Sequence, residues 1–329
     1  PCTAGGGNDE VTVSIYDAEA PAANAGPDAS ICGASTTATL GGNAPTGPAT
    51  GFWSVISGQV TLSDVTDPLA VASGLAVGET ILEWTIDNGP CGSSSDQVTI
   101  SVYDDQQAEA SAGPDQSLCL PVNTATMGGS TYSFPGTGTW TLVSGSGTIT
   151  DPGLANTSIT DLGVGENVFQ WTVDNGPCGG TTDDLVSIFI YDNAAAAAEA
   201  GPDQELCTPT TSAQLSGNAP VGVAVGTWTV SQGTGVIADV NDPNTTVNGL
   251  SIGENTFAWT VLNGPCANPL TSNQVTLFLY DGNGAAPDAG ADQDLCEVST
   301  TVLQGSPVIF PAVGTWEVNQ GTGTVTDPN

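Results

Sequence analysis

The feature that most constrains this chain is an internal repeat marked by cysteine and tryptophan. Two sets of cysteines recur, each with a period of about 88 residues, which indicates a tandem array of small domains. In every full repeat the second tryptophan follows the first at one constant spacing and precedes the late cysteine at another. The early cysteines are Cys32, Cys119, Cys207 and Cys296, the late cysteines Cys2, Cys91, Cys178 and Cys266, the first tryptophans Trp53, Trp140, Trp228 and Trp316, and the second tryptophans Trp84, Trp171 and Trp259.

The period divides the 329 residues into three full units and two partial ones. The full units are placed at 18–104, 105–192 and 193–281. Residues 1–17 are interpreted as the C-terminal end of a preceding Ig-like repeat, and 282–329 as the N-terminal half of a further one. Because the chain begins with Pro1 and stops in the middle of the pattern, we expect it to be a segment of a longer protein.

Each unit is predicted to fold into β-strands. The last segment of a unit alternates apolar and polar residues, as in Val98, Ile100 and Val102, which is typical of a strand with one buried face. The segment around the second tryptophan alternates in the same way, and an Asn-Gly-Pro-Cys turn separates the two. About seven short strands with frequent turns predict an all-β, Ig-like sandwich. The two tryptophans of a unit are expected in its core, on the third and sixth strands.

The charge composition excludes several functions. The chain has 35 acidic residues and no Lys, Arg or His, for a formal charge of −35. Without cations it cannot neutralise phosphate, so nucleic-acid binding is excluded, and an anionic membrane surface repels it. No apolar run is long enough to form a membrane-spanning helix. Without His or Lys there is no histidine-based triad and no Schiff base, and a two-carboxylate glycosidase site should break the repeat. We therefore expect no enzyme.

The motifs resemble a known class of repeat. These are Ala-Gly-Pro-Asp-Gln-x-Leu-Cys at 112–119 and 200–207, Gly-Thr-Trp, Gly-x-Gly-Glu-Asn and Asn-Gly-Pro-Cys. The set resembles the PKD-like or Ig-like repeats of large Bacteroidota surface proteins, and the resemblance covers the whole chain. It implies export by the type IX system in proteins that include gliding-motility-associated adhesins. Antibody-type domains differ, because here the cysteines flank the strands and no tyrosine stands near the start of the sixth strand.

Eight cysteines at fixed spacings, in a chain for which the resemblance implies export, predict disulfides and an oxidising location. Zinc binding is disfavoured because it requires cysteine pairs at short spacing, and even the nearest two, Cys91 and Cys119, are far apart in the sequence. Two connectivities stay open. Pairing within a unit keeps a constant separation along the chain and is slightly preferred, although the two loops lie at opposite ends of an Ig-like sandwich. The alternative joins the early cysteine of one unit to the late cysteine of the next. The preferred pairs are Cys32–Cys91, Cys119–Cys178 and Cys207–Cys266, the alternative pairs are Cys32–Cys178 and Cys119–Cys266, and Cys2 and Cys296 are expected to have partners outside the chain.

Two sets of aspartates recur near the unit junctions. Oxygen ligands gathered at a junction suit Ca²⁺, whereas Tyr-Asp and Pro-Asp sequences also favour turns and strand ends. No Asp-x-Asp-x-Asp-Gly loop is present. Calcium ligation and turn formation therefore both stay open, and no other cofactor is expected. The candidates are Asp17, Asp104, Asp192 and Asp281 after the terminal tyrosines, and Asp28, Asp115, Asp203 and Asp292 at the unit starts.

These features predict a non-enzymatic structural segment, a stalk or filament of a long secreted protein at a bacterial cell surface, which presents or forms an adhesive extracellular fibre. Its partners are then neighbouring repeats of the same chain, terminal modules outside the segment and, in the case of a filament, identical chains, without nucleic acid and without membrane insertion. The alternative is an adhesin whose repeats bind glycan or another surface ligand themselves. That function needs solvent-facing rings, and the aromatic residues outside the core pattern are Phe52, Tyr132, Phe134 and Phe310.

Overall fold

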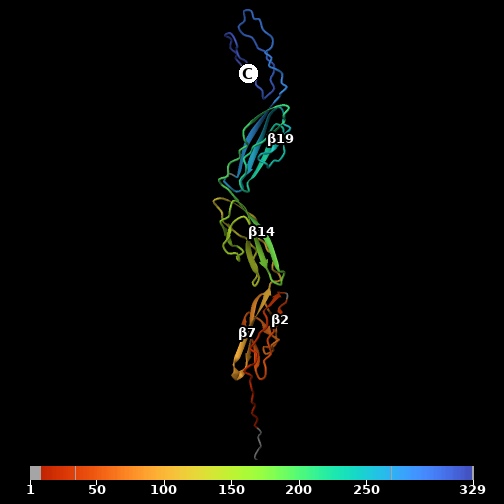
Figure 1. The fold of residues 1–329 in the computed structure, drawn as a ribbon, viewed down its shortest axis with the longest axis vertical. Coiled ribbons are helices and arrows are strands. Elements are labelled where there is room, and N and C mark those ends of the chain that lie inside the picture. Colours follow the sequence, from red (N-terminus) through yellow and green to blue (C-terminus); the bar gives the residue numbers. More distant parts are fainter. Residues whose placement is uncertain (1–8, 34, 268, 328–329) are drawn as a thin grey trace, which may run out of the picture. The chain divides into compact units, whose positions relative to one another are not determined.

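A computed structural model describes residues 9–33, 35–267 and 269–327, and shows an all-β chain (Figure 1). Three seven-stranded sandwiches follow one another along the sequence, which confirms the predicted fold class. The first contains β1 (Ala29–Cys32), β2 (Thr37–Thr39), β3 (Thr50–Ser57), β4 (Thr61–Leu62), β5 (Val71–Ser73), β6 (Gly78–Asp87), the 3-10 turn η1 (Gly89–Cys91) and β7 (Ser93–Tyr103). The second contains β8 (Gln116–Cys119), β9 (Ala125–Thr126), β10 (Thr137–Ser144), β11 (Thr148–Ile149), β12 (Ser158–Thr160), β13 (Gly165–Asp174) and β14 (Thr181–Tyr191). The third contains β15 (Gln204–Cys207), β16 (Ser212–Gln214), β17 (Val225–Gln232), β18 (Val236–Ile237), β19 (Thr246–Asn248), β20 (Gly253–Leu262) and β21 (Leu270–Tyr280).

These elements fall into two compact units. The first consists of the chain up to Pro114 together with 124–161 and 168–187. The second consists of 115–123, 162–167 and the chain from Ile188 onward. The strands of each sandwich lie inside the intervals expected from the repeat, and the placement of the domain boundaries themselves stays a prediction.

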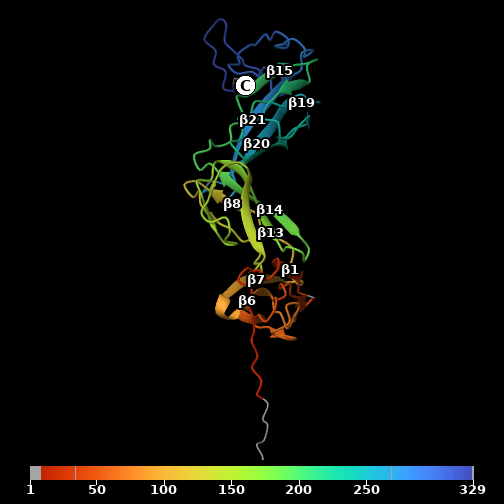
Figure 2. The same cartoon turned by 60° about the horizontal axis from the view of Figure 1, so that its bottom comes forward.

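Each sandwich combines a four-stranded sheet with a three-stranded sheet. In the first sandwich the strand orders are β1-β7-β6-β3 and β2-β5-β4, and the same topology recurs in the other two. Figure 2 labels the long paired strands of each sandwich, β6 and β7, β13 and β14, and β20 and β21. The first strand runs parallel to the last, so that Cys32 is the register partner of Tyr103. Cys119 and Tyr191, and Cys207 and Tyr280, repeat this pairing. A parallel pair brings both C-terminal ends to the same end of the sheet, so each early cysteine lies beside the terminal tyrosine of its own sandwich.

The core of each sandwich is built around a cross-strand tryptophan pair. Trp53 on β3 is the register partner of Trp84 on β6, and their ring centroids are 5.0 Å apart. The pairs Trp140–Trp171 and Trp228–Trp259 have the same separation. All six side chains are at most 3% exposed, and each indole N–H donates to a backbone carbonyl. The third and sixth strands therefore carry the core tryptophans, as predicted.

The partial repeats differ from the full ones. Among residues 9–17 and 282–327 no strand is present. Trp316 was expected in a core, and it is only partly buried. The reason is physical: its counterparts pack against the second tryptophan of their repeat, and this chain has no residue at the position that would follow Trp316 at the same spacing.

Candidate functional site: the disulfide junction

Two disulfides connect successive sandwiches. Cys32 bonds to Cys178, with Cα atoms 5.1 Å apart, and Cys119 bonds to Cys266, with Cα atoms 5.2 Å apart. Each bond joins the early cysteine of one sandwich to the late cysteine of the next, and each lies inside one compact unit. The preferred expectation of bonds within a sandwich, Cys32–Cys91, Cys119–Cys178 and Cys207–Cys266, is therefore wrong. The alternative pairing is the one the structure has.

The last strand of the sandwich explains why the within-sandwich bonds do not form. The early cysteine lies beside the C-terminal end of this strand, and the late cysteine lies in the turn that precedes its N-terminal end. The strand has 11 residues in every sandwich, which is roughly 36 Å at the usual rise per residue. A disulfide requires Cα atoms within about 7 Å. The two cysteines of one sandwich are thus at opposite ends of it.

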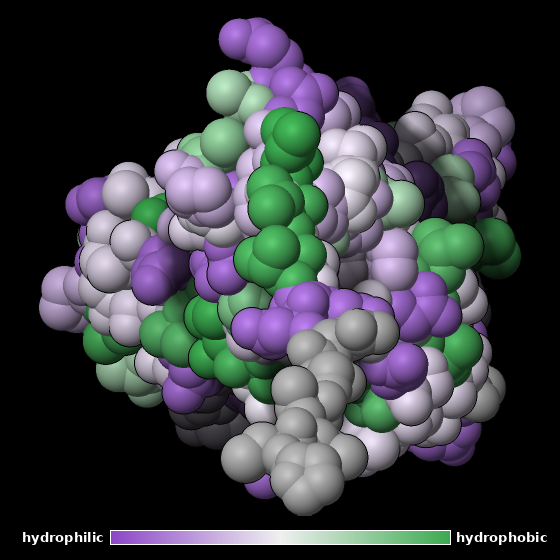
Figure 3. All heavy atoms as spheres, turned by 90° about the horizontal axis from the view of Figure 1, so that it is seen from below, coloured by the Kyte–Doolittle hydropathy of each residue, from purple (hydrophilic) through white to green (hydrophobic). Residues whose placement is uncertain are grey.

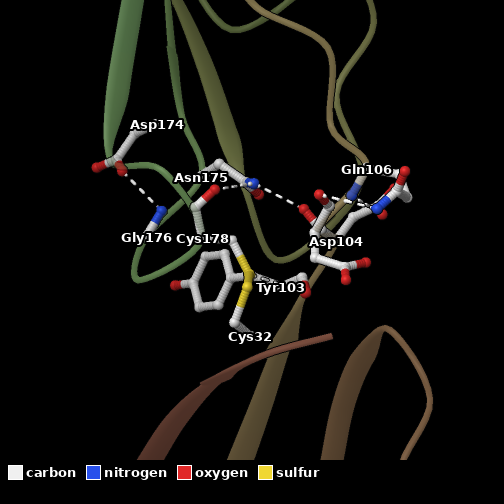
Figure 4. The surroundings of a disulfide bond; sticks show 9 residues. Cys32, Tyr103, Asp104, Gln106, Asp174, Asn175, Gly176 and Cys178 are labelled. Atoms are coloured by element: carbon white, nitrogen blue, oxygen red, sulfur yellow. Dashed lines mark hydrogen bonds between the residues drawn. A yellow bond between two sulfur atoms is a disulfide. The ribbon is translucent and has the colours of Figure 1, made fainter. Parts of the chain in front are cut away.

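A tyrosine and a glycine bring the two sandwiches into contact beside the disulfide (Figure 4). Tyr103, the last residue of β7, packs its ring on Gly176 of the next sandwich: a Cβ added to Gly176 would lie 2.6 Å from the ring. Gly176 has a φ of +51°, so this position requires glycine both for its backbone conformation and for the space occupied by the ring. Tyr191 packs on Gly264 in the same way.

An asparagine fixes the chain that enters the next sandwich. The Asn175 side-chain amide donates to the backbone carbonyl of Asp104 at 2.8 Å and to that of Cys178 at 3.1 Å. At the next junction Asn263 donates to the Asp192 carbonyl at 2.9 Å. These asparagines are buried, and such a hydrogen bond contributes on the order of 1 kcal/mol. Each junction therefore combines a disulfide, a tyrosine–glycine contact and a hydrogen bond from a buried asparagine amide to the backbone of the preceding sandwich. The sequence alone predicts a turn at Asn-Gly-Pro-Cys and does not predict that this turn contacts the Tyr-Asp pair at the end of the preceding sandwich. The one sequence feature that could have indicated the contact is that both motifs recur with the same period.

Three cysteines in the described residues have no disulfide: Cys91, Cys207 and Cys296, all exposed. Cys2 lies outside the described residues. Cys91 is a late cysteine and Cys207 an early one, so each supplies one half of a bond of the observed pattern.

The aspartates that follow the terminal tyrosines form turns. Asp17, Asp104, Asp192 and Asp281 each accept the backbone N–H of the residue two positions later, at 2.8 to 2.9 Å. The other set accepts hydrogen bonds from the last strand. Asp28, directly before β1, accepts the Thr99 N–H of β7, and Asp203, directly before β15, accepts the Thr276 N–H of β21. Among the described residues, no three acidic or cysteine side chains are gathered in a way that could hold a metal ion. The observed contacts are those of turn and strand-end residues, and calcium binding at Asp115, Asp292 and the others stays untested.

The rings considered for ligand binding do not form a repeated platform. Tyr132 packs against Trp171, with their ring centroids 6.2 Å apart, and its hydroxyl donates to the Gly153 carbonyl. Phe52, Phe134 and Phe310 are exposed. Phe134 and Phe310 share one repeat position, six residues before a first tryptophan, but the first and third sandwiches have glycine there, so the ring is not repeated in every sandwich.

Comparison with known proteins finds similar repeats and assigns no family to this chain. No known family model matches the chain. The mouse dyslexia-associated protein KIAA0319-like protein is 27% identical over 226 residues, which is 64% of this chain and 22% of that protein. The PKD domain of the KIAA 1837 protein is 26% identical with a TM-score of 0.24, covering 28% of this chain and 94% of that domain. An I-band fragment of titin is 12% identical with a TM-score of 0.33, covering 82% of this chain and 99% of the fragment.

The strand orders and the repeat themselves make the chain a tandem array of Ig-like β-sandwiches. It spans about a fifth of the length of the curated relatives it matches. In the described part of the chain, no helix has the length and apolar character needed to cross a membrane.

Proposed function

We propose that this chain is a non-enzymatic structural segment of an extracellular protein, a stalk or filament in which a disulfide links each sandwich to the next. We call each of these inter-sandwich disulfides a staple. The observation that carries the proposal is the pattern of Cys32–Cys178 and Cys119–Cys266, which ties neighbours together outside the main chain. Such disulfides form and persist in oxidising environments, which supports a location outside the cell.

The staple limits how far the array can come apart. If one sandwich opens, its neighbour stays attached through the disulfide as well as through the linker. The absence of Lys and Arg adds resistance to proteolysis, because trypsin-like proteases have no bond to cleave anywhere in the chain. Both properties suit a segment that holds another module at a distance. The motif resemblance supports a bacterial cell-surface protein exported by the type IX system as the parent.

Deletion of one repeat tests this function. Removing residues 105–192 preserves the repeat pattern, so that Cys32 should bond to Cys266 at the new junction. In the parent protein we expect the shortened stalk to keep its surface attachment and to lose reach. Binding of the isolated 329-residue chain to host cells or to a glycan array would contradict the proposal and favour repeats that bind a ligand themselves.

A further inference from the structure

An unpartnered strand sequence lies at the N-terminal side of the first sandwich. Residues 11–16 read Val-Thr-Val-Ser-Ile-Tyr, which matches Val-Thr-Ile-Ser-Val-Tyr at the end of β7. Val11, Val13 and Ile15 are 88%, 78% and 84% exposed, whereas the counterparts in β7, Val98, Ile100 and Val102, are at most 4% exposed. Figure 3 views this end of the molecule and shows apolar side chains exposed there. The segment therefore has the apolar face of a last strand and no sheet to bury it.

The end of this segment already occupies a junction. The Asn88 amide donates to the backbone carbonyl of Asp17 at 2.8 Å, as Asn175 does to Asp104. The ring of Tyr16 lies against Gly89, where an added Cβ would be 2.6 Å from it, as the ring of Tyr103 lies against Gly176. The Cys91 sulfur faces the Tyr16 carbonyl at 3.9 Å, and the Cys178 sulfur faces the Tyr103 carbonyl at 3.3 Å. Apart from the disulfide, the junction is assembled.

We propose that residues 11–16 are the seventh strand of a further sandwich of this kind, and that Cys91 forms a disulfide with the early cysteine of that sandwich. This inference rests on the proposed function. In all three sandwiches the early cysteine is the register partner of the terminal tyrosine, so the incoming cysteine would pair with Tyr16 and lie beside Cys91. The occupant is a six-stranded sandwich body. None of the three sandwiches in a second copy of this chain fits, because each already has its own seventh strand, β7, β14 or β21.

The covalent step is a thiol oxidation. The two cysteines form one S–S bond and release two protons and two electrons, which a disulfide oxidant such as glutathione disulfide accepts by thiol–disulfide exchange. The incoming first strand must run parallel to residues 11–16, and its sandwich buries Val11, Val13 and Ile15.

An extended chain tests the proposal. A copy of residues 18–97, which is the first sandwich without residues 98–103 of its last strand, is joined directly before Val11 of the chain. Val11 then follows Gln97 of the copy, as Val98 does in the first sandwich, so residues 11–16 can complete the last strand of the copy. In the added copy Cys91→Ser is introduced, which leaves one new cysteine, the copy of Cys32. After folding with reduced and oxidised glutathione, maleimide labelling and mass mapping under non-reducing conditions report the state of Cys91.

The expected result is a switch in the reactivity of one thiol. In the original chain Cys91 labels fully, and in the extended chain it is protected and found linked to the added Cys32. A matched extended chain with the added Cys32→Ser should restore labelling of Cys91 while amide exchange still shows residues 11–16 protected. A second extension, residues 105–185 before Val11 with its Cys178→Ser, should behave like the first.

Full labelling of Cys91 in both extended chains, with Cys32–Cys178 and Cys119–Cys266 formed, would overturn the inference. Its failure is distinct from failure of the proposed function, which is judged by ligand binding of the original chain and by repeat deletion.

Discussion

The staples should determine the length of unfolded chain that extends when the protein is pulled from its two ends. We consider the chain stretched from handles placed on the N-terminal side of Cys32 and on the C-terminal side of Cys266. Without disulfides, the whole chain between these two cysteines extends. With both staples, the shortest covalent path passes from Cys32 to Cys178, back along the chain to Cys119, and across to Cys266. Only the chain between Cys119 and Cys178 then extends.

These paths convert into lengths that a single-molecule experiment resolves. At about 3.5 Å per residue, the path of about 60 residues with both staples extends to ~200 Å, and the path of about 230 residues after reduction extends to ~800 Å. Removing one staple gives an intermediate value. In the Cys32→Ser, Cys178→Ser variant the path runs along about 90 residues to Cys119 and then crosses to Cys266, which is ~300 Å.

The same variant distinguishes the two pairings. If bonds formed within each sandwich, this double substitution would break two of them, and the chain between Cys32 and Cys207 would extend to about 600 Å. Optical-tweezers unfolding with and without dithiothreitol measures the difference. A released length near the larger value would refute the staple. The Cys119→Ser, Cys266→Ser variant serves as the matched control, because its path from Cys178 to Cys266 also extends to ~300 Å.

Further outcomes follow from the same structure. The Cys119→Ser, Cys266→Ser variant should lose about 4–5 kcal/mol of unfolding free energy by the chain-entropy estimate for a loop of this size, measured by urea denaturation, and an unchanged midpoint would contradict it. Gly176→Ala should destabilise the junction by about 1–3 kcal/mol, because it combines a positive φ with a clash on the Tyr103 ring, whereas Gly180→Ala has the positive φ and open space and should cost less in thermal melts. Added NaCl should raise the melting temperature, since the charge of −35 has no internal cation to balance it, and a melting temperature that falls with NaCl would refute this. Hydrogen bonds from the backbone N–H and the hydroxyl of Thr66 lower the pKa of Asp64. The ionised Asp64 carboxylate therefore stabilises the folded state above the ordinary aspartate pKa, and this stabilisation is lost on acidification below about pH 4. Asp64→Asn should flatten that part of a curve of unfolding free energy against pH. Chelator should leave the melting temperature unchanged, because the junction aspartates accept backbone N–H groups, and a drop would reveal bound Ca²⁺.

The fold could be predicted because its signals are local. Alternation around Trp84 and in residues 98–103 reports strands whose one face is buried, and the constant spacing of the tryptophans places two core positions in each sandwich. The burial of six tryptophans follows from this pattern alone. Trp316 is the exception, because burial depends on a partner residue as well as on the residue itself.

The disulfide pairing could not be predicted because it depends on which ends of two sandwiches meet. A constant separation does not discriminate: in a tandem repeat the spacing within a unit is constant, and the observed separations of 146 and 147 are nearly so. The deciding quantity is the length of the last strand, which separates Cys32 from Cys91. The junction contacts of Tyr103 with Gly176 and of Asn175 with Asp104 join residues that are distant in the sequence, and no local pattern reports such contacts.

The most direct test of the stapled array is disulfide mapping of the folded chain. Free thiols are blocked at acidic pH, the protein is digested with an endoprotease that cleaves at acidic residues, and the peptides are identified under non-reducing conditions. The staple predicts linked peptides that contain Cys32 with Cys178 and Cys119 with Cys266, and a blocked thiol on Cys91 and Cys207. Peptides that link Cys32 to Cys91 or Cys207 to Cys266 would contradict it.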